Sequence, residues 1–322
     1  MSKKWDILGV GSSIADIIVQ VESMPGADQP APMLAYSRQG GGMMATAIVA
    51  AARLGAKCNC ISTIGDDPRG QFCLEDYRRH GISTEHVRLL PGKDTIWSVS
   101  VACLDNQTRN LLTYRENAAR VLLADLDEGL IAASRFLHVY DQAEEAREVT
   151  KKAAQMAKKH GTKVSVDGFR YVPFYDEMLQ LADIWIVSEL YFRQKFGNEM
   201  APEDAVKQLY ESGPEIAIIT LGKEGLVGCD ENGVFRLPSF KVAVQDTTGA
   251  GDVFHGAFLA MAAKGMDYRE CARYASATSA IKCTRMGGRA AIPDFGVLQR
   301  FVQTGEIDYS EIDERVALYR KL

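Results

Sequence analysis

Apolar and polar positions alternate in blocks along this chain. Short apolar segments rich in β-branched residues lie at 5–10, 57–65, 134–140, 162–169, 183–189 and 215–222. Amphipathic helical patterns lie between several of them, at 42–56, 69–81, 144–161 and 201–213. Strands that alternate with helices of this length are typical of βαβ units. The pattern therefore predicts an α/β protein with a mostly parallel central sheet and helices on both of its faces.

Two stretches break this alternation. Residues 14–39 and 95–116 each look like a pair of strands without a helix between them, because apolar and polar residues alternate along them. They predict either a small separate sheet that covers the main sheet as a lid, or additional strands at the edge of the main sheet. The pattern alone does not decide between the two.

Composition excludes some classes of protein. The chain has 322 residues, is 47% hydrophobic and carries a formal net charge of -5. An acidic balance argues against a nucleic-acid partner, which requires a basic surface. No apolar run approaches the roughly 18 residues of a membrane span, and the N-terminus does not read as a signal peptide. We therefore expect a soluble cytoplasmic protein without a nucleic-acid or membrane partner.

The cysteines and histidines do not predict a metal centre. The seven cysteines are scattered without C-x-x-C pairs, and the five histidines show no metal-ligand spacing. We expect most of the cysteines to be small buried thiols in a reducing compartment.

Two glycine patterns fail as nucleotide-binding fingerprints. In GVGSSI, residues 9–14, Ile14 stands where the dinucleotide motif needs its third glycine, and a strand-like pattern follows in place of a helix. In GDDPRGQF, residues 65–72, the P-loop Lys and Ser/Thr are missing. These departures argue against a dinucleotide-dependent oxidoreductase, and they predict a simple strand-to-helix turn at 65–72.

One predicted helix begins with glycine and alanine residues, whose side chains are absent or small. In DTTGAGDVFHGAF, Gly249, Ala250 and Gly251 precede Asp252 at the start of an apolar helix. An ordinary cap with a first-turn acid explains the carboxylate but not two glycines, since each costs helix stability relative to alanine. Glycines leave the unpaired N–H groups of a helix start open to an anion. An anion hole beside a carboxylate suits phosphoryl transfer, in which the carboxylate takes the proton of the attacking hydroxyl.

Three further features have ordinary explanations when they are taken singly. Asp16 lies in a strand-like pattern, Gly40–Gly42 precede an alanine-rich helix, and a third group follows a buried strand: Thr220, Gly222 and Gly225. An outward-facing strand residue, a loop-to-helix entry and a tight turn would account for them. They also suit a ligand site, because ligands of open α/β sheets bind beyond the carboxyl ends of the strands.

Together these motifs resemble a known family. DTTGAGDVFHGAF is similar to the C-terminal signature of the ribokinase-like (PfkB) carbohydrate kinases, and GGGMMATAIVAAARLG is similar to their N-terminal signature. The order and separation of the signatures match, and the resemblance spans nearly the whole chain. It implies a Rossmann-like αβα sandwich with a small β-sheet lid, which favours the lid over the edge strands. The αβα catalytic domain would comprise 1–13, 41–94 and 117–322, and the lid 14–40 and 95–116.

The resemblance also implies roles for individual residues. The base would be Asp252, and the anion hole would be formed by Gly249, Ala250 and Gly251. Substrate contacts would come from Asp16, Gly41, Gly42, Thr46 and Arg115. Nucleotide contacts would come from Ser188, Thr220, Gly222, Gly225 and Gly251. The implied cofactors are ATP and Mg²⁺, with Mg²⁺ held through water by Glu189, and a K⁺ site near Asp246.

The chain departs from the family pattern at two positions. Many members have Asn-x-x-Glu where this chain has Ser188 and Glu189 in a shifted register. Ribokinase-type members have Asn where this chain has Thr46, which disfavours ribose as the substrate. The segment TRNLLTYRENAA, residues 108–119, is more similar to fructokinases and ketodeoxygluconate kinases, with Arg115 directed at the substrate.

The sequence thus predicts an ATP-dependent kinase that acts on a primary hydroxyl of a small sugar or sugar acid. A fructose-like neutral ketohexose is favoured, because Arg115 alone gives little basis for an acid-binding site. The alternatives are a ketodeoxygluconate-type sugar-acid kinase, a nucleoside kinase and a carbohydrate-binding member without turnover. A lid too short to bury both its faces should expose Ile96, Trp97, Val99 and Val101, and the resemblance implies a homodimer formed through the lids.

Overall fold

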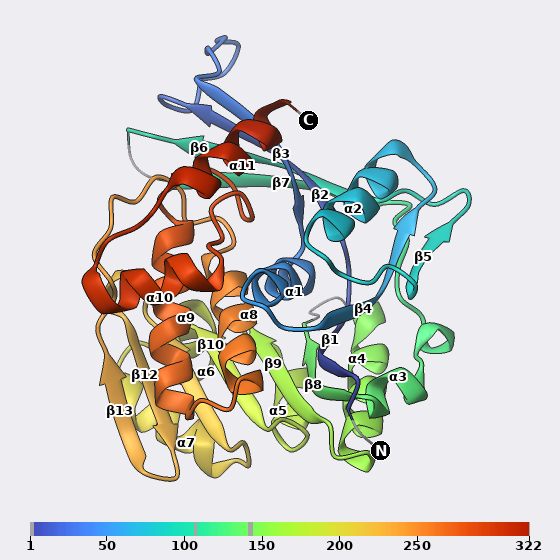
Figure 1. Ribbon diagram of the computed structural model, residues 1–322, viewed down its shortest axis with the longest axis vertical. Helices are drawn as coiled ribbons and strands as arrows, with labels where there is room; N and C mark the ends of the chain where they lie inside the picture. Colours follow the sequence, from blue (N-terminus) through green and yellow to red (C-terminus); the bar gives the residue numbers. More distant parts are fainter. Residues whose placement is uncertain (1–2, 106–107, 141–143, 322) are drawn as a thin grey trace.

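The main element of this computed structural model, which describes residues 3–105, 108–140 and 144–321, is a nine-stranded sheet (Figure 1). The strand order is β13-β12-β11-β10-β9-β8-β1-β4-β5. Strands from β11 to β5 in this order pair in parallel, whereas β12 and β13 pair antiparallel to their neighbours. The strands are β1 (Trp5–Val10), β4 (Cys58–Gly65), β5 (Val87–Leu90), β8 (Ser134–Val139), β9 (Lys163–Gly168), β10 (Ile184–Ser188), β11 (Ile216–Thr220), β12 (Leu226–Asp230) and β13 (Gly233–Leu237).

Helices cover both faces of this sheet and enclose two hydrophobic cores (Figure 1). One face carries α1 (Met43–Arg53), α2 (Pro68–Arg79), α8 (Ala250–Ala263), α9 (Tyr268–Lys282), α10 (Phe295–Thr304) and α11 (Ser310–Lys321). The other face carries α3 (Glu128–Ala132), α4 (Glu144–Lys159), α5 (Phe174–Leu179), α6 (Glu189–Phe196) and α7 (Pro202–Glu211). The chain also forms two short 3₁₀ turns, η1 (Leu123–Asp125) before α3 and η2 (Gly222–Glu224) between β11 and β12. The predicted α/β fold with a mostly parallel sheet is confirmed.

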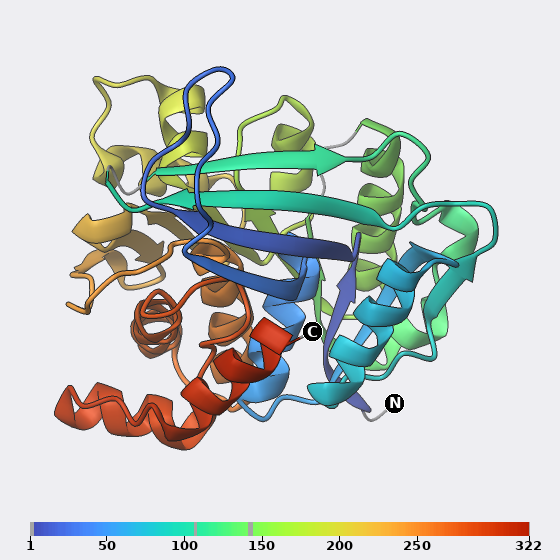
Figure 2. The same ribbon diagram turned by 90° about the horizontal axis from the view of Figure 1, so that it is seen from above.

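A second sheet of four strands lies over one end of the molecule (Figure 2). Its order is β3-β2-β6-β7, with β2 (Ile14–Val21), β3 (Ala35–Gly41), β6 (Ile96–Cys103) and β7 (Thr108–Tyr114). The small sheet is therefore separate from the main one, as a lid requires. The division into 1–13, 41–94 and 117–322 against 14–40 and 95–116 stays a prediction, and residues 1–2, 106–107, 141–143 and 322 of it lie outside the described residues.

One side chain of the lid faces the opposite way from our expectation. Ile96 is only 4% exposed and lines the cavity beneath the sheet, so its predicted exposure is wrong. Trp97, Val99 and Val101 are half-buried on the other face of β6. The reason is the two-residue period of a strand, which cannot place Ile96 on the same face as its odd-numbered neighbours.

A small residue brings α8 close to α1. Gly256 on α8 faces the backbone of α1, where a Cβ atom would lie 2.7 Å from the carbonyl carbon of Ala47. Only a glycine fits at this separation, so the two helices pack with their backbones in near contact. Strand β1 lies between β4 and β8, so the strands that follow along the chain are added first on one side of β1, as β4 and β5, and later on the other side, from β8 onward. Such a switch point opens a crevice at the carboxyl ends of the strands.

The minor predictions from sequence also have outcomes in the structure. Ile14 begins β2, which accounts for the failed dinucleotide motif. Asp67 caps α2 by accepting a hydrogen bond from the Gly70 amide at 2.7 Å, and Pro68 follows as the first helical residue. The strand-to-helix turn at 65–72 is thus confirmed. All seven cysteines are free and buried. Within the described ranges, no helix has the length and apolar character that crossing a membrane would need.

Candidate active site

A cavity of about 550 Å³ lies between the lid and the carboxyl ends of the main sheet. Strands β2, β6 and β7 of the lid, the ends of β9, β10 and β11, and the start of α8 all contribute to its wall. It brings together most of the predicted site residues: Asp16, Gly42, Arg115, Ser188, Glu189, Thr220, Gly222, Gly249, Ala250, Gly251 and Asp252. Four predicted residues do not line it: Gly41, Thr46, Gly225 and Asp246.

A larger hollow of about 840 Å³ lies at the other end of the sheet and contains none of the predicted site residues. Several of its charged side chains are already paired. Arg269 bonds Asp230 through two nitrogens at 2.8 Å, and Lys163 Nζ lies 2.5 Å from Glu215 Oε2. Because these charges are already compensated, the lid cavity is the better candidate for an active site.

The start of α8 presents open backbone to the cavity. Gly249 adopts a left-handed conformation with φ of 72°, and no side chain of the described residues caps the helix. A Cβ atom on Gly251 would meet nothing within 4 Å, so the space over this residue is free. The Ala250 amide donates to the Thr247 carbonyl at 3.2 Å. The amides of Gly249 and Gly251, with the positive end of the helix dipole, form a surface suited to an anion.

Asp252 lies in the first turn of α8 at this surface. Removal from water raises the pKa of its carboxyl to about 7, and the negative charge of Asp167 acts in the same direction. His255 and Arg109 oppose the shift without cancelling it. A carboxyl that titrates near neutral pH is well matched to general-base chemistry.

Asp16 projects from the lid into the same cavity. Its Oδ1 accepts a hydrogen bond of 2.6 Å from the Ser98 hydroxyl on β6, the strand that pairs with β2 at this register. Burial raises the pKa of Asp16, while Arg289 and Arg109 favour the charged form. The carboxylate is thus fixed on one side and open to a ligand on the other.

Gly41 and Thr46 lie behind the cavity wall. The Gly41 Cα lies against the Asp16 carboxylate, where a Cβ atom would come 2.8 Å from Asp16 Oδ1 and still closer to Oδ2. The Gly41 carbonyl accepts a hydrogen bond from Arg289 at 2.9 Å, and the buried Thr46 hydroxyl accepts one from the same guanidinium at 3.3 Å. Arg289 is itself paired with the buried Asp76 at 2.5 Å. These residues support the position of Asp16.

Gly225 and Asp246 occupy turns at the margin of the cavity. Gly225 has φ of 90° and ends the η2 turn against the backbone of Pro238. Asp246 is buried and uses both oxygens: Oδ1 accepts from the Thr248 amide and hydroxyl, and Oδ2 accepts from the Gly287 amide at 2.8 Å. These bonds tie the segment before α8 to the turn at 285–288.

Sequence reasoning missed several residues that line the cavity. Arg109 lies on β7, on the face that lines the cavity with Leu111 and Thr113, and Arg115 follows directly after the strand. The two-residue period of the strand could have revealed Arg109. Asp167 is the last residue but one of β9. Ligand contacts are common near this carboxyl end of a strand in such sheets. His255 follows Asp252 by three residues and therefore shares its helix face.

The chain matches the model of the pfkB family carbohydrate kinases over residues 5–294. It belongs to this family of carbohydrate kinases. It is 31% identical over 292 residues to a ribokinase of Haemophilus influenzae, covering 88% of this chain and 94% of the relative. It is 27% identical over 321 residues to a 5-dehydro-2-deoxygluconokinase of Bacillus licheniformis, covering 93% and 96%. A candidate ribokinase II from E. coli, solved with ATP and Mg²⁺, has the same fold with a TM-score of 0.79 at 23% identity, covering 94% of this chain and 99% of that one.

This pfkB family kinase has its own arrangement where many members carry Asn-x-x-Glu. Ser188 caps α6 by accepting a hydrogen bond from the Tyr191 amide at 3.1 Å, and its hydroxyl donates to the Phe169 carbonyl at 2.6 Å. Glu189 lines the cavity, and its carboxylate lies 3.5 Å from Arg193 one turn along the helix. The serine thus fixes the helix start, and the neighbouring carboxylate remains within the cavity wall.

Proposed function

We propose that this kinase transfers the terminal phosphoryl group of ATP to a primary hydroxyl of a small sugar or sugar acid. The observation that carries the proposal is the position of Asp252, a carboxyl with its pKa near neutrality at the uncapped start of α8. Asp16 faces the same cavity from the lid and is suited to hold sugar hydroxyls. A binding protein without turnover would have no use for such a base.

The residues present fit ATP and Mg²⁺. Gly251 leaves free space over the α8 amides, and Thr220 and Gly222 line the cavity at the end of β11. ATP with Mg²⁺ would supply the transferable phosphoryl group and neutralise its charge. We assign the phosphates to the amides of Gly249, Ala250 and Gly251, the rest of the nucleotide to Ser188, Thr220, Gly222 and Gly225, and the Mg²⁺ water shell to Glu189.

The reaction then requires two carboxylates with different tasks. Asp16 accepts hydrogen bonds from substrate hydroxyls and so orients the sugar, with Gly42 beside it in the cavity wall. Asp252 takes the proton of the attacking primary hydroxyl as the hydroxyl oxygen bonds to the terminal phosphorus, while the bond from that phosphorus to the bridging oxygen breaks and ADP leaves. The α8 amides stabilise the negative charge that develops on the phosphoryl oxygens. Gly41 and Thr46 act through the support of Asp16.

The lining of the cavity indicates an anionic substrate, whereas the sequence favoured a neutral ketohexose. Two arginines line the cavity: Arg109 on β7, and Arg115 directly after it. Neither guanidinium forms a hydrogen bond or ion pair with a side chain in the described part of the chain. Arg109 is close enough to lower the pKa values of both Asp16 and Asp252. Unpaired guanidinium groups bind carboxylates well, because their planar fork matches the two oxygens. We therefore place a sugar acid ahead of a neutral ketohexose.

An ADP-release assay on sugars, sugar acids and nucleosides tests this proposal. We expect a sugar acid to be the best substrate, and Arg109→Lys to raise its KM about tenfold, the cost of one charged hydrogen bond. If fructose alone is turned over, and its KM is unchanged in Arg109→Lys and Arg115→Lys, a neutral ketohexose would again be the favoured substrate. No turnover of any compound in the panel would contradict a sugar kinase.

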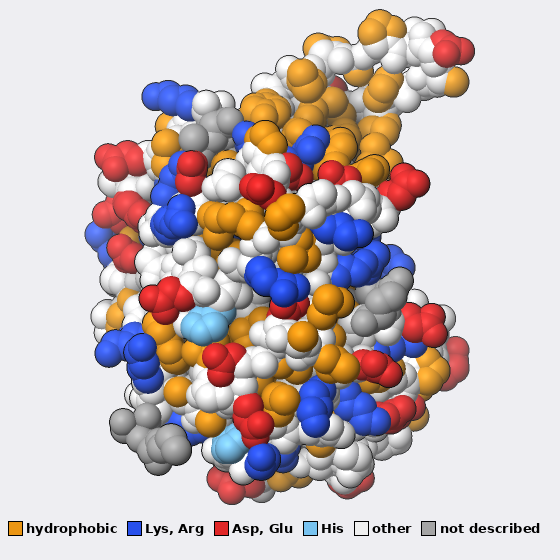
Figure 3. Space-filling view, turned by 90° about the vertical axis from the view of Figure 1, so that its right-hand side faces the viewer, with side chains coloured by type: hydrophobic (Ala, Val, Ile, Leu, Met, Phe, Trp, Pro, Cys, Tyr) orange, Lys and Arg blue, Asp and Glu red, His pale blue; other side chains and the backbone are white. Residues whose placement is uncertain are grey.

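We also propose a homodimer formed through the lids. Outer-face side chains of β7 are exposed, with Leu112 at 68% and Tyr114 at 38%, and Tyr114 contacts Trp97 at a ring distance of 6.1 Å. Hydrophobic side chains also gather on the projecting end of the molecule, where the connection from β2 to β3 lies (Figure 3). Apolar patches of this kind mark association surfaces.

A K⁺ site near Asp246 and a cytoplasmic location complete the proposal. The turn at 285–288 lies against Asp246, whose Oδ2 accepts a hydrogen bond from the Gly287 amide at 2.8 Å, and this contact is what supports the location of the site. Equal activity in K⁺ and in a large organic cation would contradict the site. Seven free buried cysteines fit a reducing compartment such as the cytoplasm.

A further inference from the structure

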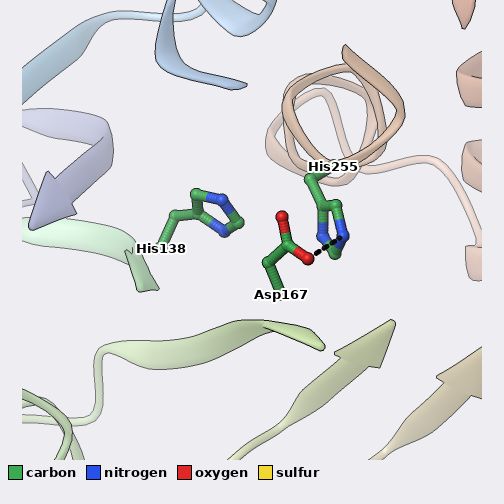
Figure 4. A group of neighbouring side chains, drawn as sticks. All are labelled: His138, Asp167 and His255. Carbon is green, nitrogen blue, oxygen red and sulfur yellow. Dashed lines mark ion pairs between the residues drawn. The ribbon is translucent and has the colours of Figure 1, made fainter. Parts of the chain in front are cut away.

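A buried polar cluster lies beside the proposed base. His138 on β8, Asp167 at the end of β9 and His255 on α8 point toward one another (Figure 4). Their exposed fractions are 0%, 4% and 4%. His255 Nε2 lies 3.2 Å from Asp167 Oδ1, and the two imidazole rings are 5.4 Å apart. The cluster therefore holds a carboxylate in the wall of the cavity that also contains Asp252.

The charge of this carboxylate is only partly compensated. Burial lowers the pKa of His138 to about 3, so its ring is neutral, and its Nδ1 lies 3.3 Å from the Ser165 hydroxyl. Asp167 Oδ2 has no hydrogen-bond partner among the described residues, which leaves the contact with His255 as the main support of the carboxylate. A buried charge with so few partners acts strongly on its neighbours.

The negative charge of Asp167 acts on Asp252 in particular. Asp252 and His255 lie three residues apart on α8 and share one face of the helix. Asp167, His255 and Asp252 all line the cavity. Two carboxylates in one confined site disfavour each other's ionisation. Apart from burial, Asp167 is the largest cause of the raised pKa of Asp252.

We propose that the Asp167–His255 pair positions and controls the protonation of Asp252, and thereby sets the pH range in which the kinase works. This inference rests on the proposed function, since it assigns Asp252 as the base. Asp167 acts through Asp252, and His255 holds Asp167 in place. Asp167 lies outside both family signatures. His255 lies within DTTGAGDVFHGAF, but the residues to which the resemblance assigns a catalytic role are Gly249, Ala250, Gly251 and Asp252.

Charged groups from the other packed elements modify this control. The lid contributes Asp16 on β2, which raises the pKa of Asp252, and Arg109 on β7, which lowers it. Helix α9 contributes Lys282, whose ammonium donates to the Asp246 carbonyl at 2.7 Å. The remaining titratable residues of the cavity wall are Arg115, Tyr140 and Glu189. Among all these groups Asp167 has the strongest single effect on Asp252.

The pH dependence of kcat/KM in Asp167→Asn tests the inference. Removal of the negative charge should move the acidic limb of the profile to lower pH by about one unit, the smallest shift expected for a charged neighbour. A limb within about 0.2 units of the wild-type position, in a folded variant, would overturn the inference. The wild type is assayed in parallel: if it turns over no substrate, the proposed function fails, whereas an unmoved limb in an active enzyme defeats only this inference.

A measurement independent of turnover gives the same answer if Asp167→Asn is unstable. Carboxyl ¹³C NMR follows the titration of Asp252 in the wild type and in Asp167→Ser, with Asp252→Asn identifying the signal. We expect a midpoint near 7 in the wild type and a lower one in the variant. Equal midpoints would refute control by Asp167.

A matched control and a rescue separate this role from a structural one. Asp230→Asn removes a carboxylate of similar burial that pairs with Arg269 at the far edge of the sheet, and it should leave the limb unmoved. His255→Gln retains an N–H donor for Asp167 and should recover most of the kcat that His255→Leu loses, with the KM for ATP unchanged. Failure of the glutamine to recover kcat would contradict the hydrogen-bond role. A stoichiometric transition metal that is lost in His138→Gln would overturn the inference, because the ion would neutralise Asp167.

Discussion

Gly41→Ala tests whether substrate binding depends on the present position of the Asp16 carboxylate in the lid. Gly41 has an ordinary negative φ, so alanine introduces no backbone strain. Its methyl group would lie 2.8 Å from Asp16 Oδ1 and closer to Oδ2, which is well inside van der Waals contact. The Asp16 carboxylate must therefore rotate away, and it then loses its bond of 2.6 Å from Ser98.

The size of the effect follows from the hydrogen bonds that a displaced carboxylate can no longer make. A hydrogen bond to a charged acceptor contributes about 1.5–3 kcal/mol. Each 1.4 kcal/mol is about tenfold in affinity. Loss of one such bond to a sugar hydroxyl should raise the KM of the sugar roughly tenfold to a hundredfold. The KM of ATP should change little, because Gly41 lies on the sugar side of the cavity.

Steady-state kinetics with varied sugar at saturating ATP measure this effect. Gly26→Ala is the matched control, since its Cβ atom would meet only Gln29 at an ordinary distance of 3.9 Å. The control should retain the wild-type KM, and circular dichroism should show both variants folded. A sugar KM in Gly41→Ala within about threefold of wild type would refute the reasoning, because that is less than one charged hydrogen bond.

Three further predictions concern the base, the anion hole and the assembly. The value of kcat/KM for the sugar should rise with pH through about 7, because Asp252 accepts a proton only when ionised, and a flat profile from about pH 6 to 8 would contradict this. Gly251→Val should remain folded, since its Cβ meets open space, yet lose at least about tenfold in kcat by covering the amides, and normal turnover would remove the anion-hole argument. Light scattering should show a dimer at micromolar concentration that dissociates in Leu112→Lys, and a wild-type monomer would exclude pairing through the lids.

Local patterns predicted the fold well where each element was long and periodic. The segments at 5–10, 163–168 and 184–188 are strands because their apolar, β-branched residues are buried on both faces of a parallel sheet. Short elements such as β5 and α3 were missed, since four or five residues hold too little periodicity to separate them from a turn. Their positions depend on pairing with distant segments.

The candidate site was predictable only in part for a similar reason. Asp252 and its glycines form one contiguous motif, so their chemistry could be read from the sequence. The cluster of His138, Asp167 and His255 joins three elements that are far apart in the chain, and no spacing connects them. Arg289 likewise meets Asp76 across 213 positions. Contacts of this kind arise from the strand order of the sheet, which the sequence pattern does not specify.

Product analysis with Asp252→Asn tests the central claim most directly. Wild-type enzyme, ATP, Mg²⁺ and the best sugar or sugar acid of the panel should yield ADP and one phosphorylated product, with ³¹P NMR placing the phosphate on a primary carbon. Asp252→Asn should bind ATP with unchanged affinity and form this product at least about a hundredfold more slowly, as expected for loss of a general base. Product formation by Asp252→Asn at the wild-type rate would contradict the account.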